Sequence, residues 1–105
     1  MTISCSPTGV QVEIRNRSDL AIDSIRVYTS TQASEILFAR LDGGETQLQF
    51  LNMEEETAVD GKFYVTYSHG SATYHEPIGN FTNGVPLFKE LTIVVAPNGV
   101  RSERR

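Results

Sequence analysis

Residues 61–78 read GKFYVTYSHGSATYHEPI, two polar–apolar segments on either side of a glycine. From Phe63 to Tyr67 the large side chains alternate with polar ones, which is the period-two pattern of a strand with one buried face. Gly70 lacks a Cβ atom and can adopt the positive φ angle that a two-residue hairpin turn requires. The stretch therefore predicts a β-hairpin that turns at residues 69–71.

The same alternation continues on both sides of this hairpin. Residues 8–17 alternate cleanly, and residues 20–30 alternate except near Asp23 and Ser24, where we expect a β-bulge. Residues 87–96 are apolar on both faces, which is typical of a strand that is covered on both sides. These three runs add three strands to the hairpin.

Residues 35–41 are ambiguous. Their alanine, leucine, glutamate and arginine residues favour a short helical turn, but the run is too short for a stable helix. The turn sequence Asp42-Gly43-Gly44 follows at once, so we predict a strand with Ile36 and Phe38 on one face.

Residues 45–53 alternate again, and we expect Leu48 and Phe50 to point inward and Gln47 and Gln49 outward. Further along, Pro77 removes a backbone donor, so the second strand of the hairpin should end there at an edge or a bend. A loop is then expected over residues 79–84.

About seven short strands without a convincing helix indicate a small antiparallel β-sandwich of immunoglobulin-like or transthyretin-like architecture, with a small closed β-barrel as the alternative. We expect a single domain over residues 1–100 and a basic, disordered tail over residues 101–105. The inward positions predicted to form the core are Val10, Val12, Ile14, Ile25, Val27, Phe50, Phe63, Val65, Leu91, Ile93 and Val95.

Composition excludes several functional classes. The 105 residues carry a formal net charge of -4, which disfavours nucleic acid as a partner because binding to phosphates depends on clustered lysine and arginine. No apolar run approaches the roughly 20 residues of a membrane span, so no membrane partner is expected. Cys5 is the only cysteine and the first residues do not resemble a signal peptide, so we expect a cytoplasmic protein.

The sequence contains no recognisable catalytic or cofactor motif. His69 and His75 are the only histidines, and a turn at Gly70 would place their rings on opposite faces of the hairpin, which argues against a metal site. Cys5 reads as a passive thiol. A Ser-His-Asp arrangement stays open, but no local signature supports one. We expect no enzyme activity, no cofactor and no metal.

Acidic residues gather in the predicted loops without the spacing of a known calcium motif. Solvated loops are the simpler reading, although a calcium- or carbohydrate-binding sandwich remains the alternative function. A sugar would have to bind the aromatic side chains of Tyr28, Tyr64 and Phe81. The loop carboxylates in question are those of Asp19, Asp23, Asp42, Glu45, Glu54, Glu55, Glu56 and Asp60.

The outward face of the hairpin is the most distinctive surface. Tyr64 and Thr66 lie on one strand and Thr73 and His75 on the other, while Phe81 is either an exposed anchor or a plug in the end of the sandwich. Tyrosine, histidine and arginine are frequent in recognition surfaces, although threonine and tyrosine also suit any solvated strand. We expect a non-catalytic protein-binding module, an adaptor, inhibitor or immunity-type protein, whose partner is another protein or a second copy of itself. Tyr28 and Arg26 would extend this surface if their strand were adjacent.

Overall fold

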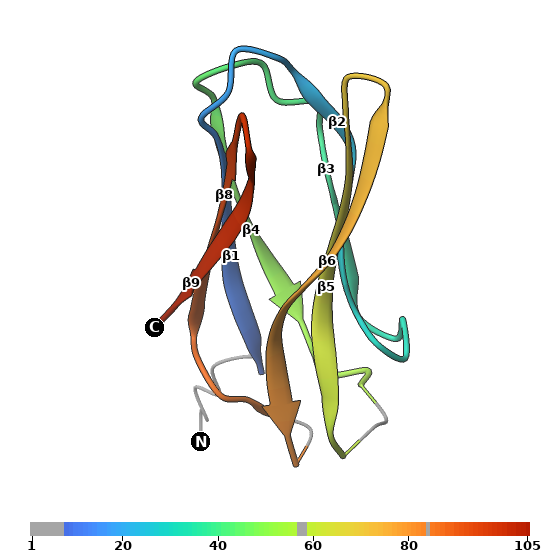
Figure 1. Ribbon diagram of the computed structural model, residues 1–105. Coiled ribbons are helices and arrows are strands. Elements are labelled where there is room, and N and C mark those ends of the chain that lie inside the picture. The colour runs from blue at the N-terminus through green and yellow to red at the C-terminus, as the bar shows by residue number, and fades with distance from the viewer. Residues whose placement is uncertain (1–7, 57–58, 84) are drawn as a thin grey trace.

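The computed structural model describes residues 8–56, 59–83 and 85–105, and these residues form two packed β-sheets without a helix (Figure 1). The predicted all-β sandwich is therefore confirmed. The strands are β1 (Gly9–Asn16), β2 (Ile22–Thr29), β3 (Glu35–Phe38), β4 (Thr46–Asn52), β5 (Gly61–His69), β6 (Ala72–Thr82), β7 (Val85–Pro86), β8 (Glu90–Ala96) and β9 (Gly99–Arg104).

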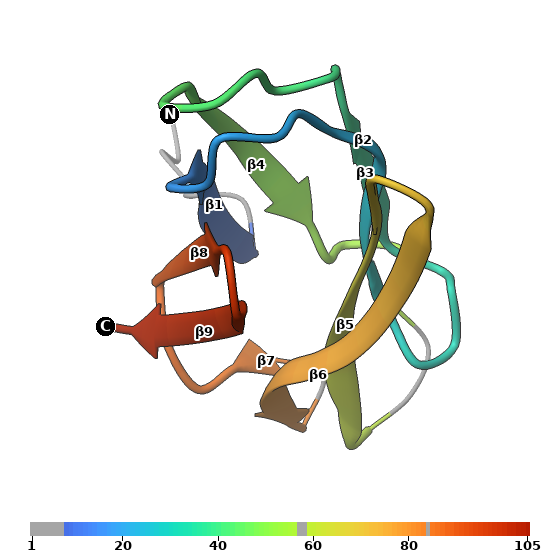
Figure 2. The same cartoon turned by 45° about the horizontal axis from the view of Figure 1, so that its top comes forward.

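One sheet has the strand order β4-β1-β8-β9 and the other β3-β2-β5-β6-β7, and Figure 2 shows the two sheets curling toward each other. All neighbours pair antiparallel except β1 and β8, which run parallel from Gln11↔Glu90 to Asn16↔Val95. The expectation of a purely antiparallel sandwich is wrong at this pair. Side-chain alternation is the same in both kinds of pairing, so the pattern alone could not give the strand direction.

The central hairpin forms as predicted. β5 and β6 pair from His69↔Ala72 through Thr66↔His75, and Gly70 in the turn has a φ angle of 66°. The predicted bulge in β2 is also confirmed, because the pairing of β2 with β5 shifts register between Asp23 and Arg26.

Strand β6 continues past its proline. Tyr64 pairs with Pro77 and Phe63 with Gly79, so Ile78 is an additional residue that bends the strand without ending it. The predicted loop over residues 79–84 is wrong for its first part, because residues 79–82 stay in β6.

Strand β4 has the opposite orientation from the one predicted. Leu48 and Phe50 point outward and are 55% and 38% exposed. The amide groups of Gln47 and Gln49 instead donate hydrogen bonds to carbonyl oxygens in and just after β3, Ala39 O at 3.1 Å and Leu37 O at 2.7 Å. β3 and β4 are edge strands of opposite sheets. The glutamine side chains of β4 therefore donate to backbone carbonyl groups at the edge of the other sheet, which have no neighbouring strand to pair with.

The basic tail is ordered, contrary to expectation. Residues 99–104 form β9, which pairs antiparallel with β8 from Ala96↔Gly99 to Leu91↔Arg104. The charged side chains of this edge strand are exposed, so they weaken the alternation that marks a strand in sequence.

The core lies between the two sheets and contains every predicted core position except Phe50. Phe63, Phe81 and Phe88 pack together within it, with ring centroids 5.5 Å apart between Phe63 and Phe81 and 5.4 Å apart between Phe63 and Phe88. In the described part of the chain, no helix has the length and apolar character needed to cross a membrane.

Candidate functional site

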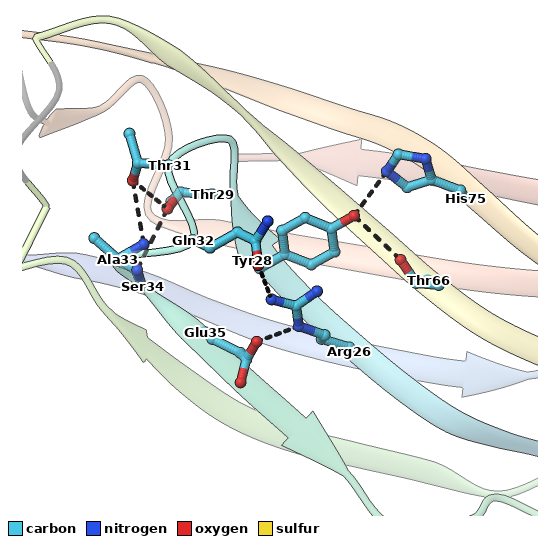
Figure 3. A network of polar contacts seen from close by, with 10 residues as sticks. All are labelled: Arg26, Tyr28, Thr29, Thr31, Gln32, Ala33, Ser34, Glu35, Thr66 and His75. Atoms are coloured by element: carbon cyan, nitrogen blue, oxygen red, sulfur yellow. Dashed lines mark hydrogen bonds and ion pairs between the residues drawn. The ribbon is translucent and has the colours of Figure 1, made fainter.

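The outer face of β2, β5 and β6 brings together five side chains that we call the aromatic patch, and Figure 3 shows all of them except Tyr64. β2 pairs directly with β5, which places Tyr28 opposite Tyr64 and Arg26 opposite Thr66, and β6 adds His75 opposite Thr66. The sequence predicted Tyr64, Thr66 and His75 together, and the adjacency of β2 brings in the other two. The members of the patch are Arg26, Tyr28, Tyr64, Thr66 and His75.

Hydrogen bonds and ring contacts fix the patch internally. The Tyr28 hydroxyl lies 2.7 Å from His75 Nε2 and accepts a hydrogen bond from the Thr66 hydroxyl at 3.4 Å. The donor and acceptor roles in the Tyr28–His75 hydrogen bond follow from which ring nitrogen of His75 carries the hydrogen. The Tyr64 ring centroid lies 4.9 Å from that of His75 and 5.7 Å from that of Tyr28.

Arg26 holds the other side of the Tyr28 ring. Its guanidinium carbon lies 4.0 Å from the ring centroid, which is a cation–π arrangement. The same guanidinium pairs with Glu35 and donates to Gln32 Oε1 at 2.8 Å. Tyr28 is only 9% exposed although neither sheet of the described residues covers this face, because its neighbours in the patch enclose it.

The other two predicted site residues do not join the patch. Thr73 is exposed on the same face, opposite Ser68 and nearer the hairpin turn. Phe81 is 1% exposed and packs in the core, so it is the plug and not a surface anchor. Its burial also removes one of the aromatic side chains on which a sugar could have stacked.

A second polar cluster at one end of the sandwich was missed by the sequence reading. Asn16 is fully buried, its amide nitrogen donates to Leu20 O at 2.9 Å and Leu41 O at 3.1 Å, and its oxygen accepts from the Ser18 hydroxyl at 2.7 Å. Ser18 Oγ also lies 3.0 Å from His69 Nε2. In the sequence, the closeness of Asn16 and Ser18 is the only sign of this cluster.

The Ser18–His69 pair resembles the start of a nucleophile–base arrangement, but its hydrogen bonds point another way. A serine hydroxyl has one proton, and the Asn16 oxygen and the Leu20 carbonyl oxygen, 2.9 Å away, can only accept it. His69 Nε2 must then carry a hydrogen and donate it to Ser18 Oγ, so this nitrogen is not the base that would activate the hydroxyl. The cluster ties the end of β5 to the loop after β1.

Tyr67, on the inner face of β5, is the described residue with a strongly shifted pKa. Burial, followed by the nearby Tyr74 and Glu76, raises the pKa of Tyr67 from 10.0 to about 12. Its ring stacks on that of Tyr74 with centroids 5.1 Å apart. The neutral phenol is therefore the form that the folded state favours.

We expect this pKa to make the protein lose stability between pH 10 and pH 12. Below pH 10 both states keep the proton, whereas in this window the unfolded chain loses it first, so the free energy of unfolding falls as pH rises. The loss is at most about 3 kcal/mol. Urea unfolding of the wild type and Tyr67→Phe at several pH values checks this. Equal pH dependence in both proteins would contradict it.

The structure shows no cluster of three or more His, Cys, Asp or Glu side chains that could hold a metal ion among residues 8–56, 59–83 and 85–105. His69 and His75 lie on opposite faces of the hairpin, as predicted: His69 contacts Ser18, and His75 contacts Tyr28. Cys5 lies outside the described residues.

Comparisons with known proteins give no function. No protein-family model matches the chain, and no curated protein matches its sequence. Among solved structures, the chain is similar to the NMR structure of a protein from Eubacterium rectale, with a TM-score of 0.56 and 15% sequence identity over 92% of this chain and 88% of that one. The likeness is one of fold.

Proposed function

We propose that this chain is a non-catalytic protein-binding module that docks its partner on the aromatic patch. The observation that carries the proposal is the mutual packing of Tyr28, Tyr64 and His75 across three strands on a face that no sheet covers. Side chains already held in one arrangement lose little conformational entropy on binding, so more of the contact energy appears as affinity. Tyrosine and arginine are also the residue types that dominate binding hot spots.

A merely solvated strand face is the alternative to a binding surface. On such a face threonine and tyrosine side chains need only suit the pleat and can point separately into water. Here Tyr28 is linked to Thr66, His75 and Arg26 at once, and its ring is buried by them. This arrangement favours the binding surface.

The partner we propose is a basic protein in the cytoplasm, for which this chain acts as an adaptor, inhibitor or immunity-type protein. The net charge of -4 favours a partner of opposite charge because complementary charge speeds association. The single cysteine, which permits no internal disulfide, agrees with that compartment. A second copy of the chain is the other candidate partner.

Affinity capture from the native source tests the proposal with two matched double variants. Tyr64→Ala/His75→Ala removes the exposed part of the patch, and Leu48→Ala/Phe50→Ala removes exposed apolar side chains from the opposite sheet. We expect one polypeptide to bind the wild type and the Leu48/Phe50 variant and to bind the patch variant at least about tenfold more weakly. Matching thermal melting curves confirm that both variants fold.

Retention of the same polypeptide by the patch variant, with loss by the Leu48/Phe50 variant, would move the site to β4 and contradict the proposal. If the partner is a second copy, sedimentation velocity gives the equivalent result. The wild type and the Leu48/Phe50 variant would then dimerise with increasing concentration, and the patch variant would stay monomeric.

A further inference from the structure

A groove of about 510 Å³ lies where the bent half of β6 faces the end of β9, and Pro77 in its lining pairs with Tyr64 of the aromatic patch. Figure 2 shows β9 at the edge of one sheet and, across from it, β6 with the short edge strand β7 of the other sheet. We call this feature the basic groove. Its cationic side chains are Lys62, Arg104 and Arg105, and its apolar ones include Pro77, Leu87 and Phe88.

The charge of the groove differs from that of the rest of the surface. The lining residues include three cations and no aspartate or glutamate, in a chain whose acidic residues outnumber its basic ones. Within the described residues, Lys62, Arg104 and Arg105 have no ion pair within 4.0 Å, as is also true of Arg17 and Lys89, whereas four other arginines have one. Those ion pairs are Arg15–Glu13, Arg26–Glu35, Arg40–Asp42 and Arg101–Glu103.

Arg104 is held in position by one end of its guanidinium. Its Nη1 donates to the carbonyl oxygen of Ile78 at 3.2 Å and to the Ser102 hydroxyl at 3.1 Å. The Nε and Nη2 donors make no hydrogen bond to other described residues. These two groups form the fork that binds a carboxylate or a phosphate through two parallel hydrogen bonds.

Backbone hydrogen bonds place Arg105 beside it. The amide of Arg105 donates to Glu90 O at 2.9 Å, and its carbonyl oxygen accepts from the amide of Lys89 at 2.8 Å. The position of the second arginine is thus set by the pairing of the two chain segments.

The apolar wall is equally well defined. Gly79 has no side chain, and a Cβ atom there would lie 2.8 Å from the Phe88 ring, so the glycine lets this ring sit against β6. Leu87 next to it is 67% exposed, an apolar side chain with little cover. A groove lined by both cations and apolar side chains suits a ligand with a charged head and an apolar body.

We propose that the basic groove binds a small organic anion, with a carboxylate or phosphate head on an apolar group. The head would contact the free donors of Arg104, with Lys62 supplying additional positive charge, while the apolar group packs on Leu87 and Phe88. The proposal is independent of the protein-binding function, because none of these residues belongs to the aromatic patch.

Amide NMR titrations at low salt test the proposal with four probes: phenyl phosphate, benzoate, inorganic phosphate and the neutral benzyl alcohol. We expect phenyl phosphate, benzoate or both to shift the amide signals of residues 78–80, 87–88 and 104–105. Inorganic phosphate and benzyl alcohol should bind more weakly, because each lacks one half of the ligand. Which of the two aromatic anions binds more tightly identifies the head group.

Charge-removing variants locate the site. Arg104→Gln and Lys62→Gln should each weaken binding of the better aromatic anion, by about tenfold for Arg104. Arg101→Gln is the matched control, because Arg101 lies on the same strand but outside the groove and pairs with Glu103. Lys62→Gln removes no described side-chain hydrogen bond, so it tests the charge even if Arg104→Gln disturbs β9.

Three results would overturn the proposal. The first is that neither aromatic anion shifts the groove signals at millimolar concentration. The second is that inorganic phosphate binds as tightly as both aromatic anions, which would leave the apolar wall without a role. The third is that Arg101→Gln weakens binding as much as Arg104→Gln and Lys62→Gln do, since the effect would then reflect net charge alone.

Discussion

Replacing Phe63 by alanine should lower the free energy of unfolding by about 3–5 kcal/mol. Phe63 is fully buried and its ring contacts those of Phe81 and Phe88, so truncation removes the centre of the aromatic core and leaves a cavity. A domain of this size typically has a total stability of roughly 5–10 kcal/mol, so the variant should be close to unfolding at room temperature. Urea denaturation followed by circular dichroism measures the loss.

The control for this prediction is Phe63→Leu, which keeps most of the buried volume and should cost about 1.5 kcal/mol or slightly more. A loss below about 1.5 kcal/mol for Phe63→Ala would mean that the surrounding side chains collapse into the space. Such a result would contradict the expectation that the truncation leaves a cavity between the two sheets.

The second large effect is expected at Asn16. Asn16→Ala should destabilise the protein by about 2–3 kcal/mol, because the Ser18 amide loses its acceptor and two carbonyl oxygens, of Leu20 and Leu41, each lose a donor. Both carbonyls retain one other hydrogen bond, from Ser18 Oγ and from the amide of Ile22, which keeps the cost below that of complete desolvation.

Asn16→Asp makes this prediction sharper. The substitution keeps the acceptor for Ser18 but places a second carboxylate oxygen against two carbonyl oxygens in a fully buried position. It should therefore destabilise the protein at neutral pH at least as much as Asn16→Ala, with Ser18→Ala the mildest of the three. Chemical denaturation ranks them, and an Asp variant as stable as the wild type would contradict the assigned orientation of the amide.

The elements that sequence reasoning predicted correctly are those encoded locally. The alternation of Phe63, Val65 and Tyr67 and the glycine at position 70 were enough to give the hairpin and its register. The broken period near Asp23 gave the bulge in β2. Each of these features depends on residues a few positions apart.

The features that were missed depend on contacts distant in sequence. Gln49 points inward because its amide meets the carbonyl of Leu37 on the facing edge strand, a pairing that residues 45–53 do not encode. Ser18 and His69 are 51 positions apart, and nothing in either segment signals that they touch. Strand β9 was missed because its charged side chains weaken the alternating pattern, although its partner β8 was predicted.

The part of the candidate site that was predicted is the part encoded locally. Tyr64, Thr66 and His75 share the hairpin, so their common face followed from the turn. Tyr28, the centre of the patch, could be included only conditionally, because strand order between β2 and β5 is set by the fold as a whole.

Photo-cross-linking in the native source bears most directly on the proposed function. A photoreactive phenylalanine at Thr73, which is exposed beside the aromatic patch without belonging to it, would report what lies on that face. The same residue at Thr92, on the outer face of β8 in the other sheet, is the control. We expect one cross-linked polypeptide from position 73 that is absent from position 92 and disappears in the Tyr64→Ala/His75→Ala background. A polypeptide captured from position 92 and not from position 73 would contradict it.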